Sequence, residues 1–144
     1  MHNLNRPLNV IGYYPSKGIM TPKCRKVLAA VAYDCPMTGE VFIIEIHQAI
    51  LIDHLHNNLL CLMQMRMYGV KVNDISKYLT ENTTDQTHSI FMQKQGETLL
   101  IPLHLHWVTT HFTSRNTTME EYNNFTQFSA TAVDPEWDPH DPYF

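Results

Sequence analysis

The clearest pattern of apolar and polar positions lies between Glu40 and Val72. Its first part, Val41–Ile46, is rich in β-branched and aromatic residues, which favour a pleated, buried surface. After a polar break, unbranched leucines and methionines over Leu59–Met67 favour a short helix, and Gly69 stands where helices commonly end. Alternation returns at Val70–Val72, so this stretch predicts a strand, a sharp corner, a helix and a second strand.

Shorter apolar runs on the N-terminal side predict further strands at Leu8–Ile11 and Lys26–Tyr33. The cluster Asp34–Gly39 contains the proline and glycine that are typical of a turn. Residues 26–50 therefore predict one long hairpin.

The C-terminal half predicts a second hairpin and a further strand. His88–Met92 and Thr98–Leu105 flank Lys94–Glu97, which contains a glycine at the turn. Trp107–Phe112 also alternates and predicts a strand, whereas the polar stretch Asp74–Asp85 predicts a loop.

A helix-capping box is indicated near the C-terminus. Thr117 and Thr118 stand three residues ahead of Glu120 and Glu121, which is the spacing that this motif requires. We expect a short helix over about Met119–Phe125.

These elements together predict a mostly-β fold, either a barrel or a sandwich, with one or two short helices. A chain of 144 residues has room for one domain with a sizeable core. We expect a β domain over residues 1–125 and a linker or tail over residues 126–144, where Asp-Pro breaks interrupt regular structure.

Composition narrows the set of partners. The net charge is −4, and the densest basic cluster is only Lys23–Lys26, which argues against nucleic-acid binding. Cys24, Cys35 and Cys61 are odd in number and form no C-x-x-C pair, so neither a disulfide framework nor a cysteine zinc site is predicted. No signal segment and no apolar run of membrane-spanning length is seen, so we expect a cytoplasmic protein with no membrane partner.

Two groups of residues could be taken for catalytic or binding residues, but the sequence favours a structural role for each. Asp34 lies in the predicted turn, where an aspartate usually caps the backbone, so we assign it no catalytic role. Met63, Met65 and Met67 alternate and cannot form a single helical stripe, so we expect them to fill core space and pad an interface.

Histidines are the remaining candidates for ligands. His104 and His106 would share one strand face, with His111 on the neighbouring stretch and His54 and His56 at the predicted corner. Three imidazoles can hold a metal ion, but no carboxylate or cysteine stands beside them at ligand spacing. We therefore predict no metal site and no other cofactor.

Five short stretches carry a resemblance to a known family. They are Ala32-Tyr33-Asp34 to Thr38-Gly39, Ile46–Ile50, Asn58-Leu59-Leu60 to Gln64-Met65-Arg66, Thr113-Ser114-Arg115 to Glu120-Glu121, and Pro135–Pro139. In this order they resemble the protease region of Copia-type retrotransposon Pol polyproteins, which is retropepsin-like. The resemblance covers roughly Leu8 to Pro139 and implies a small aspartic-protease barrel.

The catalytic motif of that family is missing. Retropepsins supply one Asp per subunit of a homodimer in an Asp-[Ser/Thr]-Gly turn, and none of the seven aspartates here begins such a triplet. In the family the triplet lies upstream of the segment that matches Leu8–Gly12. The resemblance therefore implies a barrel that is incomplete at its N-terminus and lacks the catalytic strand.

We accordingly expect a catalytically inactive, retrotransposon-derived protease fragment with no catalytic, cofactor-binding or metal-binding residues of its own. One alternative is a non-catalytic interaction module that forms a homodimer through Asn58–Val72. Another is part of an active aspartic endopeptidase, with a peptide substrate, if the true start lies upstream and restores the missing strand. A histidine-based metal protein is the third alternative.

Overall fold

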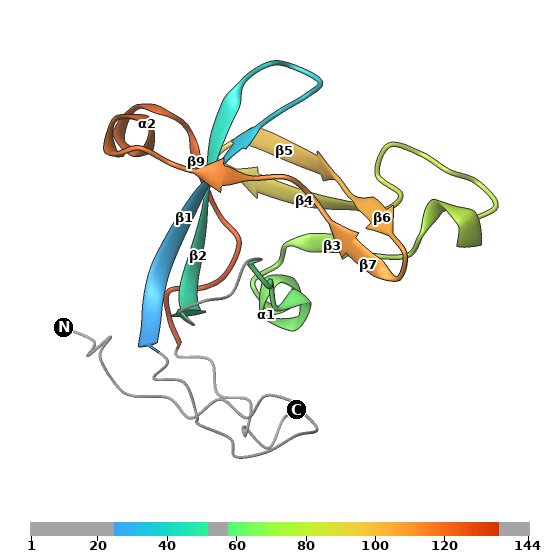
Figure 1. Ribbon diagram of the computed structural model, residues 1–144, viewed down its shortest axis with the longest axis horizontal. Coiled ribbons are helices and arrows are strands. Elements are labelled where there is room, and N and C mark those ends of the chain that lie inside the picture. Colours follow the sequence, from blue (N-terminus) through green and yellow to red (C-terminus); the bar gives the residue numbers. More distant parts are fainter. Residues whose placement is uncertain (1–24, 52–57, 136–144) are drawn as a thin grey trace, which may run out of the picture.

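The computed structural model describes residues 25–51 and 58–135, and their strands form three sheets (Figure 1). The four-stranded sheet has the order β8-β1-β2-β9, the three-stranded sheet β3-β4-β5, and the last sheet is the β6–β7 hairpin. The strands are β1 Arg25–Asp34, β2 Val41–Leu51, β3 Lys71–Asn73, β4 Ser89–Lys94, β5 Glu97–Pro102, β6 His104–His106, β7 Thr109–His111, β8 Arg115–Asn116 and β9 Gln127–Ser129. The helices are α1 Leu62–Met67, α2 Met119–Asn124 and the 3-10 turn η1 Lys77–Leu79.

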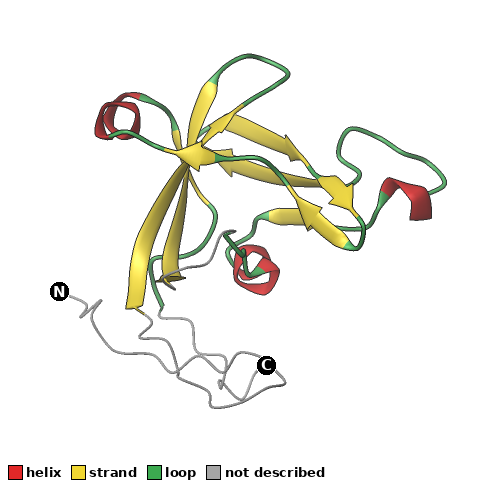
Figure 2. Ribbon diagram, in the orientation of Figure 1, coloured by secondary structure: helices red, strands yellow, loops and turns green. Residues whose placement is uncertain are grey.

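The prediction of a mostly-β fold with two short helices is confirmed (Figure 2). Within the described ranges, the strands form separate sheets and do not close into a barrel. No helix among these residues is long and apolar enough to cross a lipid bilayer.

The predicted long hairpin is present as β1 and β2, which pair antiparallel from Arg25–Leu51 to Asp34–Val41. Its turn is closed by hydrogen bonds from the Cys35 amide to the Glu40 carbonyl (2.8 Å) and from the Gly39 amide to the Cys35 carbonyl (2.9 Å). Gly39 has a φ of +74°, which glycine adopts without steric cost. The turn therefore forms for the reason that the sequence indicated.

A β-bulge interrupts this hairpin near its open end. The register shifts between Val27 and Ala29, so two residues of β2 oppose one of β1, and Gln48 has a φ of +58°. The Gln48 side-chain amide donates hydrogen bonds to the carbonyls of Ala132, Val133 and Pro135, at 3.1 to 3.2 Å. Through Gln48, the bulge in β2 therefore binds the segment that comes after β9.

Helix α1 starts later than predicted, at Leu62, and ends at the expected glycine. The Gly69 amide donates to the Arg66 carbonyl (3.0 Å), and the Val70 amide donates to the Met65 carbonyl (3.0 Å). With Gly69 at a φ of +90°, these two bonds form a Schellman C-cap. The chain then turns directly into β3.

The second predicted hairpin is confirmed as β4 and β5, with Gln95 and Gly96 both at positive φ in the turn. The prediction of a strand over Trp107–Phe112 is wrong at its start. Trp107 and Val108 form the two-residue turn between β6 and β7, and Trp107 has a φ of +58°. Neither residue is typical of such a turn, so the alternating pattern hid it.

The chain after residue 125 belongs to the β domain for longer than expected. Strand β9 pairs parallel to β2, with Phe128 opposite Ile44. The boundary predicted between residues 125 and 126 therefore falls too early, because the stretch assigned to a tail begins with a strand of the four-stranded sheet. The remainder of that stretch, from residue 136, lies outside the described residues, as do the predicted strand Leu8–Ile11 and the histidines His54 and His56.

One hydrophobic core joins the first two sheets and α1. Its central members are buried residues from β2, α1, β4, β5 and β9, namely Ile44, Met65, Ile90, Met92, Leu99, Ile101 and Phe128. At its edges Phe42 packs edge-on against Phe128 (ring centroids 5.9 Å apart), and Tyr33 packs edge-on against Phe112 (6.0 Å). Burial of this apolar surface is the main force that holds the sheets together.

Candidate functional site

An arginine lies between two acidic side chains at the turn end of the β1–β2 hairpin. Arg115 of β8 donates to both carboxylate oxygens of Asp34, at 2.8 and 3.0 Å. The same guanidinium donates to both carboxylate oxygens of Glu121, at 3.1 and 2.7 Å. Asp34 thus has a structural role, as expected, but it acts as an ion-pair partner and not as a backbone cap.

Glu121 also completes the capping box that the sequence predicted. Its backbone amide donates to the Thr118 hydroxyl (3.2 Å), and its carboxylate accepts from the Thr118 amide (2.9 Å). Hydrogen bonds from Arg115, followed by the one from the Thr118 backbone, lower the pKa of Glu121 to about 2. The hydrogen bonds to Glu121, and then those to Asp34, raise the pKa of Arg115. This network fixes the start of α2 against β1 and β8.

A second arginine–aspartate pair lies beside α1. Arg66 donates through Nη2 to Asp74 Oδ1 (2.8 Å) and to the Val72 carbonyl (3.1 Å). An aspartic protease requires two carboxylates within about a hydrogen bond of each other, one of them protonated. Asp34 and Asp74 each contact an arginine.

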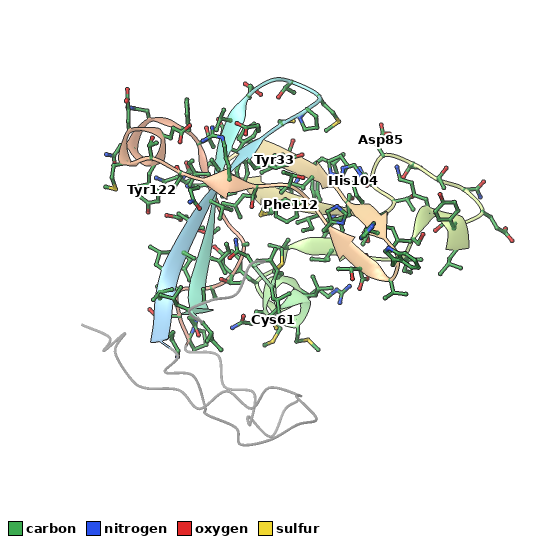
Figure 3. The ribbon with its side chains drawn as sticks, in the orientation of Figure 1. Tyr33, Cys61, Asp85, His104, Phe112 and Tyr122 are labelled. Atoms are coloured by element: carbon green, nitrogen blue, oxygen red, sulfur yellow. The ribbon has the colours of Figure 1, made fainter. Side chains whose placement is uncertain are left out.

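The polar cluster with the most buried carboxylate surrounds Glu45 of β2, which is 9% exposed. Tyr122 of α2 donates its phenol to Glu45 Oε1 (2.5 Å), and Ser129 of β9 donates its hydroxyl to Oε2 (3.2 Å). His47 Nε2 lies 3.7 Å from Oε2. The hydrogen bond to Glu45, and then burial, raise the pKa of Tyr122 (labelled in Figure 3).

We call Glu45, His47, Tyr122 and Ser129 the Glu45 cluster. The sequence pattern did not predict this cluster, although Glu45 is a single carboxylate within the apolar run Val41–Ile46. A hollow of about 390 Å³ lies nearby but shares no residue with the cluster, and its lining is mostly polar: Lys94, Gln95, Glu97, Asn123, Phe125, Thr126 and Gln127. The Glu45 cluster therefore joins β2, α2 and β9 and does not line that hollow.

Three of the predicted histidines lie on the β6–β7 hairpin. His104 is directly opposite His111, whereas His106 is opposite Thr109. His88 lies at the start of β4 and is buried, and its Nε2 is 3.2 Å from the Thr110 hydroxyl. Burial lowers the pKa of His88. Within residues 25–51 and 58–135, no three His, Cys, Asp or Glu side chains are placed to hold one metal ion.

The outer face of α1 carries exposed apolar side chains. Met65 is buried in the core, but Met63 and Met67, one helical turn apart, are each more than half exposed. Leu59, three residues before the helix, and Tyr68, directly after it, are also exposed, at 83% and 47%. We call Leu59, Met63, Met67 and Tyr68 the α1 surface. Figure 3 shows its helix beside the labelled Cys61.

Comparison with known protein families, with curated proteins and with solved structures finds no match to this chain.

Proposed function

We propose that this chain is a retropepsin-like β domain from the protease region of a Copia-type retrotransposon Pol polyprotein, and that these 144 residues alone have no aspartic protease activity. The observation that carries the proposal is the succession of a long strand (β2), the helix α1, the Gly69 cap and β3. Four of the five stretches that resemble the family lie in this unit, in the β1–β2 hairpin, and around β8 and α2. The fifth, Pro135–Pro139, lies outside the described residues except for Pro135. On this proposal, the three sheets are parts of an incomplete retropepsin-like barrel.

The lack of activity is argued from the chemistry of the aspartates. Catalysis by this class requires an ionised and a protonated carboxylate side by side, which together activate a water molecule. No Asp-[Ser/Thr]-Gly triplet occurs in the sequence. Asp34 and Asp74 each form an ion pair with an arginine, Arg115 and Arg66 respectively.

A peptidase assay tests this proposal directly. The purified chain is incubated with a mixed peptide library from pH 4 to pH 7, with and without pepstatin, beside a known aspartic protease as positive control. We expect no pepstatin-sensitive cleavage. Any pepstatin-sensitive cleavage by the wild-type chain would overturn the proposal. Loss of that cleavage in Asp34→Asn would show that Asp34 is catalytic.

The α1 surface favours a second function, a homodimerisation module. Four apolar side chains of the α1 surface are exposed within the predicted interface Asn58–Val72. Methionine is adaptable and common at interaction surfaces, and exposed apolar side chains that lie together mark such surfaces. We infer that a second copy of this chain covers the α1 surface, as the resemblance to a dimeric family implies.

Sedimentation of charge-substituted variants tests the dimer. We expect wild type to dimerise at micromolar concentration. The double variant Met63→Lys/Met67→Lys should shift the chain to monomer, because the buried lysines of one copy would repel those of the other. Val108→Lys is the matched control, since Val108 is 95% exposed at the tip of the β6–β7 hairpin. A monomeric wild type, or equal dimerisation by all variants, would rule out this function.

A further inference from the structure

The exposed face of the β6–β7 hairpin brings two imidazoles together. His104 and His111 are Cα partners on adjacent antiparallel strands, so their side chains project from the same face. Their ring centroids are 5.9 Å apart, with a 43° angle between the ring planes. His104, labelled in Figure 3, lies on β6 of this hairpin and is exposed.

This centroid separation lies near the upper limit of what one metal ion allows between two histidines. A histidine nitrogen binds Zn²⁺ at about 2.0–2.1 Å, which places the ion roughly 3 Å from the ring centroid. Two imidazoles on one tetrahedral ion therefore have centroids about 5 Å apart, and about 6 Å is the limit for ligands on opposite sides of the ion. The rings of His104 and His111 have to move about 1 Å closer to share a tetrahedral ion.

The neighbouring histidines do not share this geometry. His106 faces Thr109 across the hairpin, and its ring packs edge-on against Trp107, with centroids 6.2 Å apart. His88 is buried, and its Nε2 contacts the Thr110 hydroxyl from the other side of the hairpin. The pairing thus distinguishes His104 and His111 from the other histidines of this region.

We propose that His104 and His111 form a two-histidine site for a divalent first-row transition-metal ion such as Zn²⁺. Neutral imidazole suits these ions, and water completes the coordination. Because the β6–β7 pairing already holds the two strands together, binding orders little additional chain. The site is exposed, so a bound ion can exchange with solution. This inference goes beyond the proposed function, in which no metal takes part.

The test uses the full chain without a histidine tag, titrated with ZnCl₂ at about pH 7.5, above the ordinary pKa of histidine. Binding is followed through the imidazole C–H signals of each histidine by NMR, so that the hairpin is separated from other histidines. We expect the His104 and His111 signals to shift together with one dissociation constant. His104→Ala and His111→Ala should each weaken this binding by about tenfold or more, because the chelate loses its second contact.

His106→Ala is the matched control and should bind Zn²⁺ at the hairpin within about twofold of wild type, a difference of less than 1 kcal/mol. Far-UV circular dichroism verifies that every variant folds. The proposal is overturned if the His104 and His111 signals do not respond to Zn²⁺. It is equally overturned if either alanine variant binds at the hairpin as tightly as wild type, or if His106→Ala weakens binding as much as they do.

Discussion

Phe128→Ala is expected to destabilise the protein by about 3 to 5 kcal/mol, the range for removing a fully buried aromatic ring. Phe128 is 1% exposed, lies on β9 and packs edge-on against Phe42. Its removal leaves a cavity where the four-stranded sheet meets the core. Since small domains are stable by only about 5 to 15 kcal/mol, this loss removes a large share of the free energy of unfolding.

Urea denaturation followed by circular dichroism measures this effect. Phe125→Ala is the matched control, because Phe125 lies three residues away at the end of α2 and is 40% exposed. We expect the control to cost about 1 kcal/mol or less. Equal losses in both variants, or a loss below about 1 kcal/mol for Phe128→Ala, would show that β9 is not part of the cooperative core.

Position 128 also shows where prediction from the sequence failed. Strands β1, β2, β4 and β5 were predictable, because each has a run of apolar residues bounded by a turn with glycine. Strand β9 is only Gln127–Ser129, and its place in the sheet depends on pairing with residues more than 80 positions earlier. No local pattern encodes such a pairing. The Asp-Pro breaks that follow therefore led to the prediction of a linker or tail for this stretch.

The helix ends show the same difference between features that a local sequence signal marks and features that it does not. The capping box of α2 and the C-terminal glycine of α1 are local signals, and both ends lie where they were predicted. The start of α1 has no side-chain cap at Cys61, and there the prediction was three residues too early. At Trp107 the turn lacks glycine or asparagine, so the strand pattern continued through it.

The candidate site was less predictable than the fold. Asp34 and Arg115 are 81 residues apart, and Glu45 and Tyr122 are 77 residues apart. The sequence indicated that Asp34 is structural, but its partner becomes evident only when β8 is paired with β1. The role of Glu45 could not be predicted, because the apolar residues on either side of it indicate only a buried strand.

The Glu45 cluster carries the second large effect. We expect Glu45→Ala to cost about 2 to 3 kcal/mol, because the Tyr122 and Ser129 hydroxyls lose a charged acceptor in a partly buried setting. Glu81→Ala, an exposed glutamate in the loop before β4, is the control and should stay within about 0.5 kcal/mol of wild type. Thermal and urea unfolding of both variants provide the measurement.

A double-mutant cycle separates the hydrogen bond from the general loss of packing. Tyr122→Phe removes the donor and keeps the ring, and Glu45→Ala removes the acceptor, so their combination isolates the contact between the two side chains. We expect a coupling free energy of about 1 to 2 kcal/mol, as for residues that share a hydrogen bond. Additive effects of the two substitutions would show that the 2.5 Å contact does not stabilise the fold.

The ionisation of Tyr122 gives an independent test of the same contact. Its pKa is raised in the folded protein, first by the hydrogen bond to Glu45 and then by burial. A raised pKa means that the contact stabilises the fold at every pH below the ordinary tyrosine value of about 10, and that this contribution is lost as the pH rises through the folded pKa. Ultraviolet titration of wild type, with Tyr122→Phe subtracted to isolate one of the seven tyrosines, should show this late ionisation. In Glu45→Gln the acceptor is neutral, so Tyr122 should ionise at lower pH, whereas an unchanged titration would show that Glu45 does not hold the phenol proton.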